Sequence, residues 1–226
     1  MDDKLPIGDA LRFGWEGMKK HFWFLLGLYV LVFTIRFGTS FVLAFTSGKS
    51  QELSAALEFL LMVAYQVIFT TGTAAVALKI CDGQKPELGD FIRDGKVLVF
   101  YFLSLILVGA LVGAGLILLI FPGIYAALRL SQTVYFVVEQ KKDPVESIKA
   151  SWEATRGMAG ALFVYFLIVA GFMFVGFLCL ILGVIPVWFM TIIASAYLYR
   201  VLNQRMHACQ PQKDVSTSSP VLVELS

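Results

Sequence analysis

Residues Val97–Ile120 read VLVFYFLSLILVGALVGAGLILLI, a stretch without one charged side chain. A helix of this length is about 36 Å long, because each residue adds about 1.5 Å. The hydrocarbon core of a bilayer is roughly 30 Å thick, and uncharged apolar runs of this length are typical of transmembrane helices. The stretch therefore predicts a helix that crosses a membrane.

The composition extends this prediction to the whole chain. Of the 226 residues, 58% are hydrophobic and 15% are charged, whereas soluble domains average about 25% charged residues. The mean hydropathy is +0.80. Six spans would use roughly 120 apolar positions, which this composition can supply. These values exclude a cytosolic enzyme, a disordered chain and a secreted disulfide scaffold.

The apolar runs on either side of this stretch predict an all-α bundle of six transmembrane helices. The fourth run is the shortest, about 24 Å as a helix, so a re-entrant hairpin made by the third and fourth runs is the alternative. Gly109 and Gly113 predict close helix packing within the bundle. The six runs are Phe22–Phe45, Ala55–Ala77, Val97–Ile120, Gly123–Val138, Ala159–Leu182 and Val184–Leu202.

The basic residues are distributed very unevenly between the two sides of these spans. One side carries only Lys49, and Arg36 and Arg129 lie inside spans. The positive-inside rule places the Lys/Arg-rich side, and with it both termini, in the cytoplasm. The remaining 15 of the 18 basic residues lie on that side: Lys4, Arg12, Lys19, Lys20, Lys79, Lys85, Arg93, Lys96, Lys141, Lys142, Lys149, Arg156, Arg200, Arg205 and Lys213.

A short polar motif recurs along the chain. Asp9–Glu16 (DALRFGWE) aligns with Glu146–Glu153 (ESIKASWE), and Gly89–Lys96 is a weaker third copy. Each copy follows a proline and leads into a pair of spans, which predicts three helix-plus-hairpin units. We expect one membrane domain over residues 1–206, built from units 5–80, 86–140 and 143–205, with a disordered tail over 207–226.

The three motif copies are predicted to form short cytoplasmic amphipathic helices. In the third copy Val145, Ile148 and Trp152 share one helical face. Such helices lie in the membrane interface or pack on the protein's own cytoplasmic face, and a partner-binding helix is a third option. The residues of interest for these roles are Trp15, Glu16, Trp152 and Glu153.

Several of these segments together resemble a known family. Leu119–Tyr125 (LIFPGIY), Arg129-Leu-Ser131, Tyr135–Glu139 (YFVVE) and Glu146–Gly157 (ESIKASWEATRG) are similar to the membrane domain attached to some glycerophosphoryl diester phosphodiesterases. They are also similar to small bacterial inner-membrane proteins of unknown function related to that domain. The resemblance covers roughly residues 5–205. It implies a bacterial cytoplasmic-membrane protein with about six spans. It does not imply phosphodiesterase activity, because the hydrolase is a separate barrel of about 250 residues.

No sequence motif for catalysis is present. The chain contains no HExxH, CxxC, GxSxG or phosphate-loop pattern, so we predict no enzyme activity, no metal and no cofactor. The basic residues flank membrane spans, so no nucleic-acid binding is expected either.

Three ionisable residues within the spans are the candidate site. Arg36, Glu58 and Arg129 all fall in the outer half of the predicted bilayer, where each ionisable group costs at least about 2–3 kcal/mol unless it is paired or faces water. They predict a polar intramembrane cluster that binds an anionic group such as a lipid phosphate. The alternative is a structural pair of arginine and Glu58, or arginines that reach the outer headgroups.

Two functional classes follow for this multi-pass inner-membrane protein. The first is a protein without catalytic activity that organises or assists a membrane partner or an envelope process, in contact with the lipid bilayer and a membrane protein partner. The second is a transporter or lipid-handling protein that uses Arg36, Glu58 and Arg129 to hold an anionic lipid. Internal repeats are common in transporters, but there they usually place broken helices near the midplane.

Overall fold

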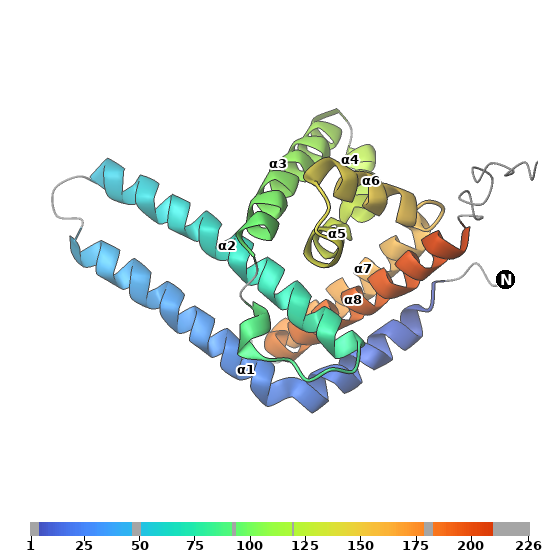
Figure 1. Cartoon of the computed structure of the whole chain (residues 1–226), viewed down its shortest axis with the longest axis horizontal. Helices are drawn as coiled ribbons and strands as arrows, with labels where there is room; N and C mark the ends of the chain where they lie inside the picture. The colour runs from blue at the N-terminus through green and yellow to red at the C-terminus, as the bar shows by residue number, and fades with distance from the viewer. Residues whose placement is uncertain (1–4, 47–50, 92–93, 119, 179–182, 210–226) are drawn as a thin grey trace, which may run out of the picture.

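The structure is a computed structural model of the chain that describes residues 5–46, 51–91, 94–118, 120–178 and 183–209. Over these residues all regular structure is helical, as predicted (Figure 1). The elements are α1 (Ile7–Thr46), α2 (Gln51–Cys81), the 3₁₀ turn η1 (Leu88–Phe91), α3 (Gly95–Leu118), α4 (Ile120–Leu130), α5 (Thr133–Gln140), α6 (Pro144–Ala154), α7 (Ala159–Leu178) and α8 (Val184–Cys209).

Five helices in the described part of the chain are long and apolar enough to cross a membrane. They lie over Ile7–Val42, Ala55–Cys81, Gly95–Leu118, Ala159–Leu178 and Val184–Met206. The sequence predicts one helix over the fourth apolar run, Gly123–Val138. The structure instead divides this run into two helices, α4 and α5. Neither piece spans a bilayer alone, since 11 residues extend only about 16 Å. The count of six spans therefore stays a prediction.

Hydroxyl side chains explain why the fourth run breaks. When a helix ends, its last carbonyl groups lose their intrahelical donors and need other partners. Thr133 Oγ1 donates to the Leu130 carbonyl at 2.8 Å. The Arg129 carbonyl accepts hydrogen bonds from Ser151 Oγ at 2.8 Å and from Thr155 Oγ1 at 3.2 Å. The break is thus stabilised by residues of α6 and its C-terminal cap.

Helix α8 is the element around which the others pack. It contacts α1, α2, α6 and α7, and Ile193, Ala196 and Tyr199 on it are fully buried. In Figure 1, α1 and α2 extend to one side as a long hairpin, while α3 to α6 gather on the other. The N-terminal end of the chain and the end of α8 lie on the same side of the picture.

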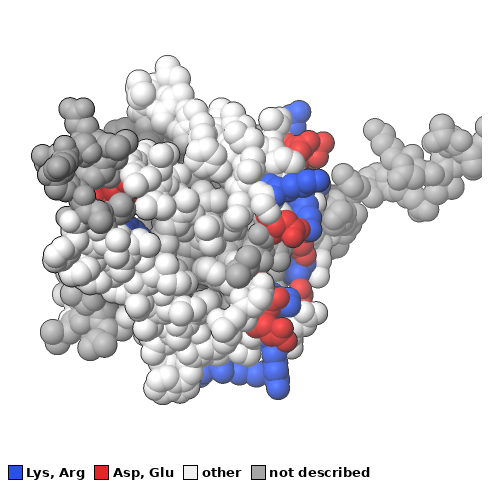
Figure 2. All heavy atoms as spheres, turned by 60° about the vertical axis from the view of Figure 1, so that its left-hand side comes forward, with Lys and Arg blue, Asp and Glu red and all other residues white. Residues whose placement is uncertain are grey.

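Charged side chains gather along one edge of the molecule, and the surface next to them is mostly uncharged (Figure 2). Ion pairs connect the ends of four helices at this charged face. Arg200 of α8 binds Glu139 of α5 and, at 2.7 Å, Asp82 after α2. Lys141 after α5 binds Asp94 before α3 at 2.5 Å. The sidedness of charge predicted from the sequence is therefore present in the folded chain.

The three motif copies adopt three different structures. The first is the N-terminal part of α1, separated from the rest by a kink at His21, and the third is α6. The predicted middle helix is not present as one helix over the described residues of that copy, because Gly89–Phe91 lie in the short turn η1 and Gly95 and Lys96 already begin α3. There the Asp90 carboxylate accepts the Glu87 backbone N–H at 2.8 Å, a local bond that favours a turn over a helix. The threefold repeat stays a prediction.

The small-residue contact on α3 also differs from the prediction. Among the described residues, nothing lies within 4 Å of where a Cβ on Gly109 or Gly113 would be, so these glycines make no close helix contact there. The close approach lies at Gly115, whose added Cβ would be 2.9 Å from the Cα of Gly123 on α4. At the other end of the chain, α8 continues to Cys209, beyond the predicted tail boundary at residue 207. Residues 210–226 of that tail lie outside the described residues.

Candidate functional site

Two of the three predicted intramembrane charges lie together. Arg36 on α1 donates from Nη1 to Ser40 Oγ, one helical turn further on. Ser40 Oγ in turn donates to Glu58 Oε1 on α2 at 3.5 Å. A single hydroxyl therefore connects a cation on one helix to a carboxylate on its neighbour.

Arg129 lies apart from this pair, in contact with α6. Its Nε donates to Thr155 Oγ1 at 3.4 Å, its Nη1 donates to Tyr125 Oη at 3.0 Å, and its Nη2 donates to the Trp152 carbonyl. The guanidinium carbon lies 4.0 Å from the centre of the Trp152 ring. Arg129 is buried, with 6% of its surface exposed, and it forms no ion pair with a described residue.

The contacts of Arg129 are those of a structural residue. Trp152 lies in the last turn of α6, where backbone carbonyls carry partial negative charge, so the guanidinium caps that helix. The carbonyl of Arg129 itself is capped by Ser151 and Thr155. Two helix C-termini thus satisfy each other, and aromatic rings stabilise the cation. These contacts explain how the charge of Arg129 is stabilised without a bound ligand.

Arg36 instead lines an open groove between α1, α2 and α8. The groove has a volume of about 680 Å³, within the range of about 300–1,000 Å³ typical of ligand sites. We call it the α1–α2–α8 groove. Its lining residues are Tyr29, Phe33, Arg36, Tyr65, Gln66, Phe69, Thr70, Thr73, Val184, Ile185, Trp188 and Ile192.

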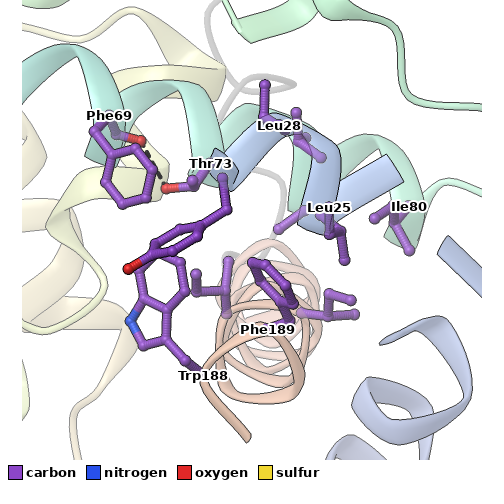
Figure 3. A pocket seen from close by; sticks show the side chains of 12 residues that line it. Leu25, Leu28, Phe69, Thr73, Ile80, Trp188 and Phe189 are labelled. Atoms are coloured by element: carbon purple, nitrogen blue, oxygen red, sulfur yellow. Dashed lines mark hydrogen bonds between the residues drawn. The ribbon is translucent and has the colours of Figure 1, made fainter. Parts of the chain in front are cut away.

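The groove is lined by both polar and apolar side chains, and an apolar cavity lies next to it. Arg36 and Gln66 lie toward the α1–α2 connection, and Tyr29 follows about 10 Å deeper along α1. Below it is a small cavity of about 20 Å³ that shares Tyr29, Phe69 and Trp188 with the groove (Figure 3). Leu25, Leu28 and Ile80 line this deeper cavity.

Stacked aromatic rings form one wall of the groove. Phe69 is parallel to Trp188, with ring centres 5.3 Å apart, and to Tyr65, with ring centres 5.9 Å apart. Tyr29 packs edge-on against Trp188 at 6.0 Å. Figure 3 shows Phe69 and Trp188 on one side of the deeper cavity, with the Thr73 hydroxyl bonded to the Phe69 carbonyl. Rings packed in this way form a fixed wall.

The residues predicted for the amphipathic helices lie at the surface. Trp15 is 45% exposed, with Lys19 Nζ 5.6 Å from its ring centre, and Glu16 pairs with Arg12. Trp152 is 40% exposed, and Glu153 is also exposed. Tryptophan at the edge of a charged face is typical of a membrane–water interface.

The buried side of α6 is small and polar. The helix turns Ser147, Ala150 and Ser151 inward, whereas Val145 of the predicted apolar face is 53% exposed. Val145 is therefore free to contact the bilayer interface, whereas the Trp152 ring of the same face contacts Arg129 and Tyr125.

The groove residues other than Arg36 were missed by sequence reasoning. Tyr29, Phe33 and Tyr65, Phe69 recur at four-residue spacing, which places each pair on one helical face. In a chain with 20 phenylalanines this signal is not distinctive. Over the residues that the structure describes, no three His, Cys, Asp or Glu side chains are grouped so that they could hold a metal ion.

Comparison with known proteins returns no match: no family model, curated protein or solved structure is similar to the chain.

Proposed function

We propose that the chain is an integral membrane protein that binds a phosphate-bearing amphiphile in the α1–α2–α8 groove and catalyses no reaction. The observation that supports this most is the composition of the lining. A cation, Arg36, and aromatic rings line the groove, and the small cavity next to it is lined mainly by aliphatic side chains. A lipid likewise combines a charged headgroup with an apolar chain.

The energetics favour Arg36 as the headgroup ligand. A guanidinium binds phosphate oxygens through parallel N–H donors. Within a membrane an arginine is costly unless it faces protein, water or a partner charge, and Arg36 lines the open groove. A bound phosphate would supply the opposite charge there, and the aromatic wall would cover the chain.

We also propose a topology for this protein in a bacterial cytoplasmic membrane. The ion pairs join the end of α2, the start of α3, the end of α5 and α8 at one face. Helix α3 therefore begins at this face and crosses the membrane away from it. Helices α4 and α5 together cross back to the same face, and they form the sixth membrane crossing. The positive-inside rule assigns the charged face to the cytoplasm. The family resemblance to the phosphodiesterase-linked membrane domain agrees with this topology.

Native mass spectrometry of the gently purified protein tests the lipid proposal. We expect one phospholipid bound per chain. Arg36→Gln should raise the dissociation constant of the lipid at least about tenfold, since a charge-assisted hydrogen bond is worth about 1.5–3 kcal/mol. Ile185→Trp should displace the lipid by filling the groove.

Two control variants leave the groove unchanged. Arg12→Gln removes an exposed cation from the charged face, and Leu167→Trp adds the same ring at an exposed position of α7. Both should keep the lipid. Equal occupancy in all four variants would contradict the proposal.

A role in organising a membrane partner is the second candidate, and a separate groove favours it. Between α2 and α3 lies an open, shallow hollow of about 700 Å³ that is lined by apolar residues, among them Ala64, Val67 and Phe102. We propose that one transmembrane helix of a partner packs there. Cross-linking in intact membranes should capture the partner with the wild type and with Leu167→Trp, but not with Ala64→Trp. Capture unaffected by Ala64→Trp would count against it.

A further inference from the structure

We infer that the headgroup bound in the α1–α2–α8 groove is zwitterionic, a phosphate joined to a primary amine as in phosphatidylethanolamine. This inference rests on the proposed function and deepens it. It is carried by Glu58, the carboxylate that lies beside the cation of the groove.

The two charges are close but not in contact. Ser40 lies between them, accepting a hydrogen bond from Arg36 and donating one to Glu58 at 3.5 Å. Arg36 and Glu58 do not form an ion pair with each other. A guanidinium has five N–H donors and a carboxylate about four acceptor positions, so both groups keep bonding capacity for a ligand.

The carboxylate disfavours a purely anionic headgroup. A phosphate bound to Arg36 would lie within a few ångströms of Glu58, and two like charges repel at that range. An ammonium group on the same headgroup removes this cost, because it can donate hydrogen bonds to Glu58 while the phosphate stays on Arg36. A primary amine has three such N–H donors, whereas the trimethylammonium of choline has none.

Aromatic faces near Arg36 would contribute further to binding an ammonium group. Phe33 lines the groove and is 55% exposed. It stacks between Tyr29 and Phe37, with both ring-centre distances 6.3 Å. The part of the Phe33 ring that these neighbours leave exposed can attract a cation, and a phosphatidylglycerol headgroup carries no cation.

The test measures lipid selectivity of the full-length chain in detergent micelles by native mass spectrometry. The protein is titrated with phosphatidylethanolamine, phosphatidylcholine and phosphatidylglycerol that carry identical acyl chains. We expect phosphatidylethanolamine to bind about fivefold tighter than phosphatidylglycerol, the ratio given by one partly exposed ion pair. Phosphatidylcholine should lie between them.

Two substitutions separate the roles of the charges. Glu58→Gln should abolish the preference by weakening phosphatidylethanolamine and strengthening phosphatidylglycerol. Arg36→Gln should weaken all three lipids. Glu153→Gln, which neutralises an exposed carboxylate at the end of α6, should leave the selectivity unchanged.

The outcomes distinguish the two proposals. Wild-type binding of phosphatidylglycerol as tight as that of phosphatidylethanolamine, or a preference that survives Glu58→Gln, overturns the headgroup inference and leaves the groove as a lipid site. Absence of Arg36-dependent binding for every lipid overturns the proposed function itself.

Discussion

Arg36 and Arg129 are both arginines within apolar segments, but their side chains have different surroundings. Arg129 donates to a hydroxyl, a phenol and a backbone carbonyl of described neighbours, and it is buried. Arg36 has one hydroxyl partner, Ser40, and lines an open groove. The same chemical group therefore stabilises a helix junction in one place and lines an open groove in the other, where we propose that it binds a ligand.

The first prediction concerns Arg129. Arg129→Lys should lower the free energy of unfolding by about 2 kcal/mol, nearly as much as Arg129→Gln, because lysine cannot reach three acceptors in a planar arrangement. Thermal unfolding in detergent would measure this. Arg156→Lys, at an exposed position, should change stability by less than about 0.5 kcal/mol. If Arg129→Lys is as stable as Arg156→Lys, the capping role is wrong.

At the scale of elements, the short turn η1 is held against α2 by one aromatic side chain. Phe91 is buried and covers Gly72, where an added Cβ would lie 2.5 Å from a Phe91 ring carbon and 2.7 Å from its carbonyl oxygen. Asp90 adds an ion pair to Lys79 of α2 at 2.5 Å. The connection from α2 to α3 is therefore packed tightly.

This packing gives a prediction with a matched control. Gly72→Ala should destabilise the fold by about 1–3 kcal/mol, since the new methyl group forces η1 away from α2. Gly171→Ala on α7 has nothing within 4 Å of the added Cβ and should be neutral or slightly stabilising, because alanine favours helix more than glycine does. Equal melting temperatures for the two variants would show that η1 is not docked as described.

Sequence patterns identified the long helices but not the break in the fourth run. An uncharged run such as Val97–Ile120 has only one stable backbone structure in a bilayer, so it could be predicted. The break after Leu130 depends on Ser151 and Thr155, which lie 22 and 26 residues from Arg129. The pattern of residues within the fourth apolar run therefore could not predict where its helix breaks.

The same reasoning applies to the candidate site. Arg36 and Glu58 could be predicted because a charged residue inside an apolar run is evident from the sequence alone. Their proximity follows because they lie on two consecutive helices, α1 and α2, that run antiparallel. The groove could not be predicted, since Trp188 meets Phe69 and Tyr29 only where three helices cross. Arg129 does not join Arg36 and Glu58, because its side chain contacts Tyr125, Trp152 and Thr155 instead, and its depth in the bilayer stays a prediction.

In the proposed topology of the whole molecule, the charged face is cytoplasmic and the α4–α5 pair forms the sixth crossing. Single cysteines in a background without native cysteines test this with a membrane-impermeant thiol reagent. Glu16→Cys and Glu153→Cys should react only from the cytoplasmic side. Phe121→Cys, 86% exposed near the start of α4, should react from the opposite side. Labelling of all three positions from one side would exclude the proposed topology.

The central claim is that a phospholipid occupies the α1–α2–α8 groove with its phosphate on Arg36. Photo-cross-linking with a phospholipid that carries a diazirine near its headgroup, followed by peptide mapping, tests it most directly. Adducts should concentrate on groove residues such as Phe33, Tyr65 and Ile185, and Arg36→Gln should reduce them. Adducts spread evenly over outward-facing residues such as Phe41, Leu103 and Leu167, and unchanged by that substitution, would contradict it.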